Sequence, residues 1–148
     1  MNKFLNIFLI AFATLLIGCN DDCDEGNRPT PASFFVEIVD ETSNENVFEN
    51  ETYTAQQITL LDENEVAIPY KFITNSNLIQ IFPPVSNATG NSLLIKLNNE
   101  TTSQTDEINV NYDVSSSAGE CFTTFKIENI LFPNNPSEVV QGVYVIKI

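Results

Sequence analysis

A strict alternation of apolar and polar side chains in the second half of the chain limits the possible folds more than any other feature. Successive side chains of a β-strand point to opposite faces of its sheet, so a period of two places all apolar members on one face. The segment is therefore predicted as an antiparallel strand with one buried face. Its apolar members are Ile108, Val110, Tyr112 and Val114, and its polar members are Asn109, Asn111, Asp113 and Ser115.

The rest of the chain after residue 33 consists of short apolar runs separated by turn-forming residues. Asp62–Glu65 is a candidate four-residue hairpin loop. Pro83–Pro84 ends a strand because proline donates no ladder hydrogen bond. Ser115–Gly119 and Pro133–Pro136 are further candidate turns. The other predicted strands are Phe34–Val39, Gln57–Leu61, Val66–Ile73, Leu78–Phe82, Leu93–Leu97, Cys121–Ile127 and Val143–Ile148.

These patterns predict an all-β domain over residues 34–148. No segment beyond residue 18 shows ten or more residues with helical spacing. Seven to nine short strands with closely spaced turns favour a single antiparallel β-sandwich of immunoglobulin-like or transthyretin-like type. A small barrel is the alternative.

The N-terminus has the organisation of a secretory signal. Lys3 supplies a positive start, Phe4–Ile17 forms an apolar run, and Gly18 provides a small residue before Cys19. The alternative, a retained transmembrane anchor, needs roughly 20 apolar residues, more than this run provides. Residues 1–18 are therefore expected to be removed.

The end of this segment, Leu16-Ile17-Gly18-Cys19, resembles the lipobox of bacterial lipoproteins. The resemblance implies that lipid is attached to Cys19 and that the signal peptidase cuts just before it. Residues 19–33 are acidic and contain proline, so they are predicted to form a tether to the membrane. Asn20-Asp21-Asp22 is similar to the acidic export signal of Bacteroidota lipoproteins, although a plain solvated linker fits the same residues.

The charge and residue composition exclude several functions. The chain has 6 basic and 20 acidic side chains and a net charge of −14, which becomes −15 when Lys3 is lost. Such a surface repels phosphate backbones, so nucleic acid is excluded as a partner, and attachment to lipid must come from acyl chains. The chain has no histidine, so Ser-His and Cys-His catalytic arrangements are also excluded.

Two cysteines remain once Cys19 is assigned to lipid. Cys23 and Cys121 form an even pair in an exported chain and are predicted to make a disulfide, with two free thiols as the alternative. Cys19 and Cys23 are four residues apart, at most ~14 Å when extended. The pairing would therefore hold the domain close to the bilayer.

Asp40 and Glu41 are the candidate metal ligands. They begin a stretch of oxygen-bearing residues that ends with Glu51. The spacing is partly that of an EF-hand, but Glu45 occupies the position where the sharp turn needs glycine, so an EF-hand is rejected. A looser Ca²⁺ site at Asp40 and Glu41 stays open beside a solvated acidic loop.

Several positions together resemble a group of small, uncharacterised, β-rich lipoproteins of Bacteroidota. They are Cys19, Cys23, Thr30-Pro31, the strand Phe35–Asp40, Cys121 and the last strand Val143–Ile148. The chain departs from that pattern at Phe122, where glycine is expected after the late cysteine. The resemblance implies a location and a fold, and no reaction.

We therefore expect a lipid-anchored protein of the cell envelope, at the outer membrane on its periplasmic or surface-exposed face, that acts without catalysis. Its role would be that of a binding or structural accessory module, with an envelope protein or a glycan as partner. The alternatives are a Ca²⁺-dependent or glycan-binding surface module and, as a third possibility, a hydrolase with two carboxylates.

Overall fold

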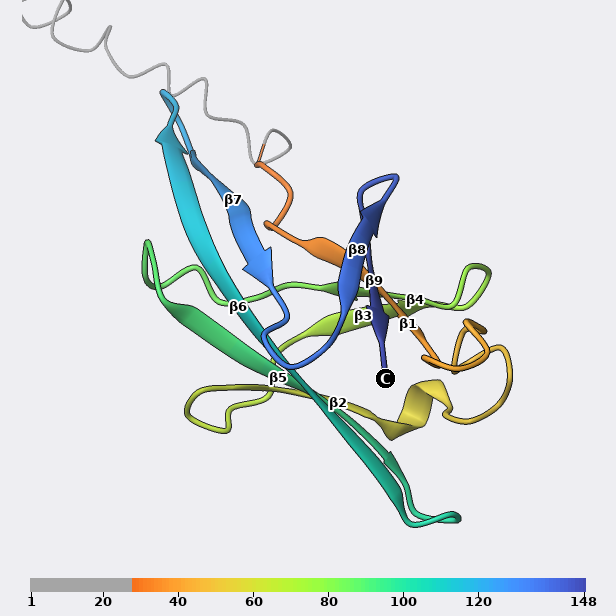
Figure 1. Ribbon diagram of the computed structural model, residues 1–148. Coiled ribbons are helices and arrows are strands. Elements are labelled where there is room, and N and C mark those ends of the chain that lie inside the picture. Colours follow the sequence, from red (N-terminus) through yellow and green to blue (C-terminus); the bar gives the residue numbers. More distant parts are fainter. Residues whose placement is uncertain (1–27) are drawn as a thin grey trace, which may run out of the picture.

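The computed structural model describes residues 28–148 (Figure 1). This part of the chain is all-β, with nine strands, a three-residue 3₁₀ helix (η2, Ala55–Gln57) and no α-helix. The strands are β1 Phe34–Val39, β2 Ile58–Asp62, β3 Tyr70–Ile73, β4 Leu78–Ile81, β5 Asn91–Asn99, β6 Gln104–Ala118, β7 Thr123–Leu131, β8 Ser137–Val140 and β9 Val143–Lys147. Within these residues no helix is long and apolar enough to span a bilayer.

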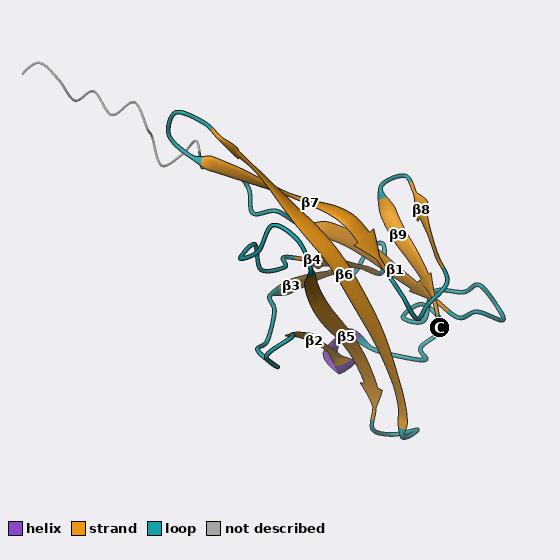
Figure 2. Ribbon diagram, turned by 60° about the vertical axis from the view of Figure 1, so that its left-hand side comes forward, coloured by secondary structure: helices purple, strands orange, loops and turns teal. Residues whose placement is uncertain are grey.

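The strands form two sheets. One has the order β3-β4-β1-β9-β8 and the other β2-β5-β6-β7. Neighbouring strands are antiparallel, except that β9 runs parallel to β1. The long strand β6 extends along its sheet, and its two turns, to β5 and to β7, lie at opposite ends of the molecule in both views (Figures 1 and 2).

The two sheets share one hydrophobic core. Val36 and Ile38 of β1 and Ile146 of β9 come from the first sheet, and Ile95 of β5 and Ile108 of β6 from the second; all five are fully buried. Burying such an aliphatic side chain stabilises the fold by roughly 1.5–3 kcal/mol relative to leaving it exposed. Hydrophobic burial on both inner faces therefore holds the sheets together.

The alternating segment behaves as predicted. Its four apolar side chains are buried, while Asn109 and Asn111 on the same strand are exposed. The strands predicted at Phe34–Val39, Leu78–Phe82, Leu93–Leu97 and Val143–Ile148 are also confirmed, to within a few residues at their ends. The all-β prediction is thus confirmed, as is the turn predicted at Pro133–Pro136.

The hairpin predicted around Asp62–Glu65 is wrong in part. The chain turns there, and Asp62 Oδ1 accepts the backbone N–H groups of Asn64 and Val66 at 2.8 Å. A single bridge between Leu61 and Ala67 follows, and the chain then crosses to the other sheet, where β3 pairs with β4. The N–H of Ile68 still donates to the carbonyl of Leu60 at 2.9 Å, but Pro69 already bonds to the first sheet, its carbonyl accepting the N–H of Phe82 at 3.1 Å.

The turn predicted at Ser115–Gly119 is also wrong. Strand β6 continues to Ala118, and its serines pair across the ladder with Thr124, Phe125 and Lys126 of β7. Serine is a weak strand former, but these ladder hydrogen bonds outweigh its local preference. The β6–β7 turn is Gly119–Phe122, closed by the N–H of Gly119 bonding to the carbonyl of Phe122 at 2.9 Å. A Cβ at Gly119 would lie 3.0 Å from that oxygen, so a larger residue here would require the turn to shift by a few tenths of an ångström.

Candidate functional site

Strands β7 and β8 form the edges of the two sheets on the same side of the molecule, opposite β2 and β3. Consecutive in the chain, they are joined by residues 132–136. Five large hydrophobic side chains are exposed within the described residues, and four of them lie on these two strands: Phe125, Leu131, Val139 and Val140. Exposed apolar side chains on edge strands are typical of surfaces that receive a partner.

Strand β8 was not predicted from the sequence, although one local signal for it exists. Gln141 and Gly142 form a two-residue loop in which both φ angles are positive, +51° and +84°. This is the type I′ turn that matches the twist of a β-hairpin. All four residues of β8 are exposed, so no apolar alternation marks the strand.

The register of this hairpin shows which backbone groups of β8 are available. Val140 and Val143 flank the two-residue loop and face one another across the ladder. They therefore make the hydrogen-bonded pair that closes the hairpin. Along an antiparallel strand, the N–H and C=O groups of successive residues point alternately toward the partner strand and away from it. The N–H and C=O groups of Val139 and Ser137 consequently point away from β9, toward the open edge.

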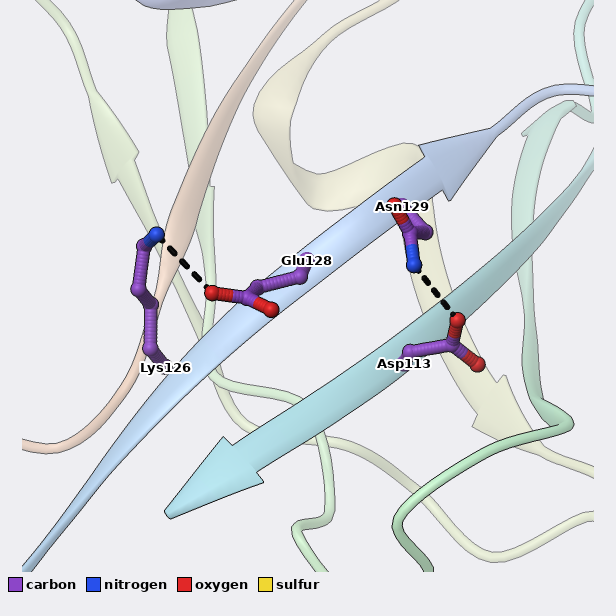
Figure 3. A network of polar contacts seen from close by, with 4 residues as sticks. All are labelled: Asp113, Lys126, Glu128 and Asn129. Carbon is purple, nitrogen blue, oxygen red and sulfur yellow. Dashed lines mark hydrogen bonds and ion pairs between the residues drawn. The ribbon is translucent and has the colours of Figure 1, made fainter. Parts of the chain in front are cut away.

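A β-bulge interrupts the pairing of β6 and β7. Two steps along β6, from Asn111 to Asp113, correspond to three steps along β7, from Leu131 to Glu128. Asn129 occupies the bulge with φ +51°, a conformation that asparagine tolerates better than most residues. Its amide donates to Asp113 Oδ2 at 2.8 Å (Figure 3). Asp113 Oδ1 also accepts the Gly90 N–H at 3.2 Å, so one carboxylate joins the loop before β5 to β7.

An exposed ion pair lies beside the bulge on β7. Lys126 Nζ and Glu128 Oε1 are 2.9 Å apart (Figure 3). Lys126, more than the hydrogen bond from Ser115, holds the pKa of the Glu128 carboxyl below its ordinary value, and Glu128 in turn raises the pKa of Lys126. Both groups therefore stay charged at neutral pH, and because they are solvated the pair contributes little to stability.

A shallow depression of about 380 Å³ adjoins the bulge. Ser92, Asn111 and Asn129 supply hydroxyl and amide groups to it, and Leu131, which is 62% exposed, supplies an apolar surface. The same outer face of this sheet carries further exposed amides and hydroxyls on β2, β5 and β6. They are Thr59, Asn98, Thr105 and Asn109. This chemistry is suited to hydrogen bonding with a polyhydroxylated ligand.

The predicted Ca²⁺ ligands lie in the turn after β1. Asp40 Oδ1 accepts the backbone N–H groups of Thr42 at 3.0 Å and Ser43 at 2.7 Å. The backbone hydrogen bond from Ser43, the strongest influence, lowers the pKa of Asp40. The carboxylate thus caps its own turn, and no group of three or more His, Cys, Asp or Glu side chains suited to a metal occurs within residues 28–148. Among residues 28–148 no third acidic ligand lies beside Asp40 and Glu41, and Ca²⁺ binding stays a prediction.

The lipidation and disulfide predictions fall mostly beyond the part that the structure describes. Cys19 and Cys23 lie outside residues 28–148, whereas Cys121 lies in the β6–β7 turn. The pairing of Cys23 with Cys121 therefore stays a prediction.

Sequence reasoning did not find the bulge or the open edge of β8. Asn129 gives no signal of a bulge, because a bulge is defined against the partner strand.

Comparisons with protein-family models, with curated proteins and with solved structures find no match for this chain.

Proposed function

We propose that this chain is a lipid-anchored protein of the cell envelope that acts without catalysis, by adding a strand of a partner protein to the open edge of β8. The observation that carries this proposal is the position and exposure of β8. It is an edge strand, all four of its residues are exposed, and Val139 and Val140 are 60% and 48% exposed.

The anchor and the location rest on the sequence. The lipobox-like end of the signal segment favours lipid on Cys19, and the resemblance to Bacteroidota lipoproteins favours the outer membrane. The two-sheet, all-β architecture supports the further proposal that the domain is an immunoglobulin-like or transthyretin-like sandwich.

Strand β8 is a better docking edge than β7. Residues 29–33 line a depression together with Thr124–Ile127, so part of β7 already has chain beside it. At β8, in contrast, the backbone groups of Ser137 and Val139 are directed outward and are exposed. An added strand would gain main-chain hydrogen bonds there, and the valines would provide apolar contact.

The occupant that fits is an extended segment of a neutral or basic envelope protein. The mature chain carries a net charge of −15, which disfavours a second copy and acidic partners by mutual repulsion. Glu138 in the middle of β8 adds a local preference for a cationic side chain on the partner strand.

Val139→Pro tests this proposal. Proline removes the outward N–H of Val139 and no bond of the β8–β9 ladder, so the fold should be retained while strand addition is lost. Val139→Thr is the matched control, because it keeps the N–H and the β-branched shape. Capture of envelope proteins by the lipidated protein from detergent-solubilised membranes, with a photo-crosslinking residue at position 138, measures the interaction.

We expect Val139→Thr to retain a partner that crosslinks to position 138 through an extended segment, and Val139→Pro to lose it. Equal capture by both variants would exclude strand addition at β8. Thermal unfolding of the two variants at similar temperatures is the required check on folding.

Glycan binding on the outer face of the second sheet is the second candidate. The amide and hydroxyl groups beside Leu131 in the depression at the bulge favour it. Titration calorimetry with envelope polysaccharides, using Asn111→Ala and Leu131→Ala as variants, tests it; heat of binding that both variants leave unchanged would exclude this face.

A further inference from the structure

The far end of the β6–β7 hairpin extends beyond the hydrophobic core. Val114 and Ile127 are the last cross-strand pair with side chains packed in or against the core. From Ser116 to Lys126 every residue is exposed except Phe122, which is half-buried. We call residues 115–125 the hairpin tip.

The hairpin tip differs from the rest of the surface in its chemistry. It contains two phenylalanines, Phe122 in the turn and Phe125 on β7, and Phe125 is 38% exposed. Its other residues are Ser, Thr, Ala, Gly and Cys121, with Glu120 as its one charged side chain. In a chain of net charge −14, this is a projecting, weakly charged and partly aromatic surface.

The described chain begins at the same end of the molecule (Figure 1). Pro29–Ser33 line a depression of about 470 Å³ together with Thr124–Ile127 of β7. Ser33 is fixed to the first sheet, because Gln80 Nε2 of β4 donates to its Oγ at 3.0 Å. The described chain therefore begins beside the hairpin tip, whereas the β5–β6 turn lies at the opposite end (Figure 2).

We propose that the hairpin tip is the membrane-facing end of the domain, and that Phe122 and Phe125 contact the bilayer interface. This inference rests on the proposed lipid anchor at Cys19. Arg28 is nine positions after Cys19, at most ~32 Å of extended chain, so an anchored domain keeps this end near the lipid. The tether thus maintains a high local concentration of the tip at the surface.

Two forces then favour this orientation. Aromatic side chains are stabilised at the interface between headgroups and acyl chains, which favours contact by the tip. Anionic lipid repels the acidic remainder of the domain, which turns that remainder away from the bilayer. The opposite β5–β6 turn has no aromatic residue and carries Glu100.

The absence of tryptophan from the sequence allows a direct test. Phe122→Trp places a single fluorophore in the hairpin tip, and Thr102→Trp, an exposed position in the β5–β6 turn, is the matched control. Both variants are prepared as the mature lipidated protein and incorporated into phosphatidylethanolamine vesicles whose acyl chains are brominated. Vesicle flotation measures anchoring, and bromine quenching measures the proximity of each tryptophan to lipid.

We expect both variants to float, with Phe122→Trp emission quenched and shifted to shorter wavelength and Thr102→Trp emission unchanged. Flotation without quenching of Phe122→Trp would overturn the orientation and leave the anchor intact. Equal quenching of both positions would also overturn the orientation. Failure of the lipid-modified variants to float would overturn the anchoring itself. Phe125→Trp repeats the measurement if thermal unfolding shows that Phe122→Trp disturbs the turn.

Discussion

The hydroxyl of Tyr112 provides a quantitative test of how the second sheet is held to the loop that follows β4. Tyr112 is 2% exposed, and its hydroxyl donates to the carbonyl of Pro84 at 2.9 Å. Tyr112→Phe removes this hydrogen bond and leaves the ring in place. Since the Pro84 residue is partly exposed, water can reach it, and the cost should be about 1 kcal/mol. For a domain of this size the melting temperature should fall by roughly 3–6 °C near neutral pH.

The pH dependence makes this prediction specific. Burial, and after it the negative charges of Asp62 and Glu63, raise the pKa of Tyr112 to about 12 from its ordinary value of 10.0. The folded state therefore holds this proton more tightly than the unfolded state. The resulting stability is fully present below pH 10 and is lost as the pH rises toward 12, at up to ~1.4 kcal/mol per pH unit.

The phenylalanine variant has no hydroxyl to ionise and lacks this loss. The free energies of unfolding of the two proteins should therefore converge near pH 11, as measured by urea unfolding between pH 7 and pH 11.5. Other buried groups, including Tyr53, are common to both proteins and cancel in the difference. A stability advantage of the wild-type protein over Tyr112→Phe that stays constant or grows above pH 10 would refute the assignment of the raised pKa to Tyr112.

Two further predictions concern positions with positive φ. At the bulge, Asn129→Gly and Asn129→Val both remove the hydrogen bond to Asp113, but glycine adopts φ +51° freely. Asn129→Val should therefore be less stable than Asn129→Gly by about 1–2 kcal/mol; equal unfolding free energies for the two variants would contradict this. In the β8–β9 turn, Gly142→Ala should destabilise the fold by about 1 kcal/mol. A Cβ there would meet no other atom within 4 Å, so the cost comes from the φ of +84°, which alanine adopts only with strain. An unchanged thermal midpoint would show that the turn can relax into another type.

The candidate sites were less predictable from the sequence than the strands. Leu131, Asn129 and Asp113 lie within one depression because the bulge in β7 sets their register, and no spacing in the sequence indicates a bulge. The open edge of β8 depends on β9 pairing with β1 on its other side, which is a contact between the two ends of the domain. Edge positions of this kind are decided by which strands are left without a neighbour.

The sequence by itself determined which side chains are buried where apolar and polar residues alternate regularly. The alternation at Ile108–Val114 requires one buried face, because the side-chain period of a strand is two, and local turn residues such as Pro133 end strands through their own backbone limits. These effects act over a few residues and are therefore readable along the chain.

The tertiary structure alone decided which strands pair. In the folded chain, the segment after Ala67 joins the other sheet, and β6 continues through its serines to Ala118. Strand β9 lies parallel to β1. A period of two identifies a face but not a neighbour, since a backbone ladder can form with any strand of suitable register. Pairing is settled only when all strands bury their apolar faces in one common core.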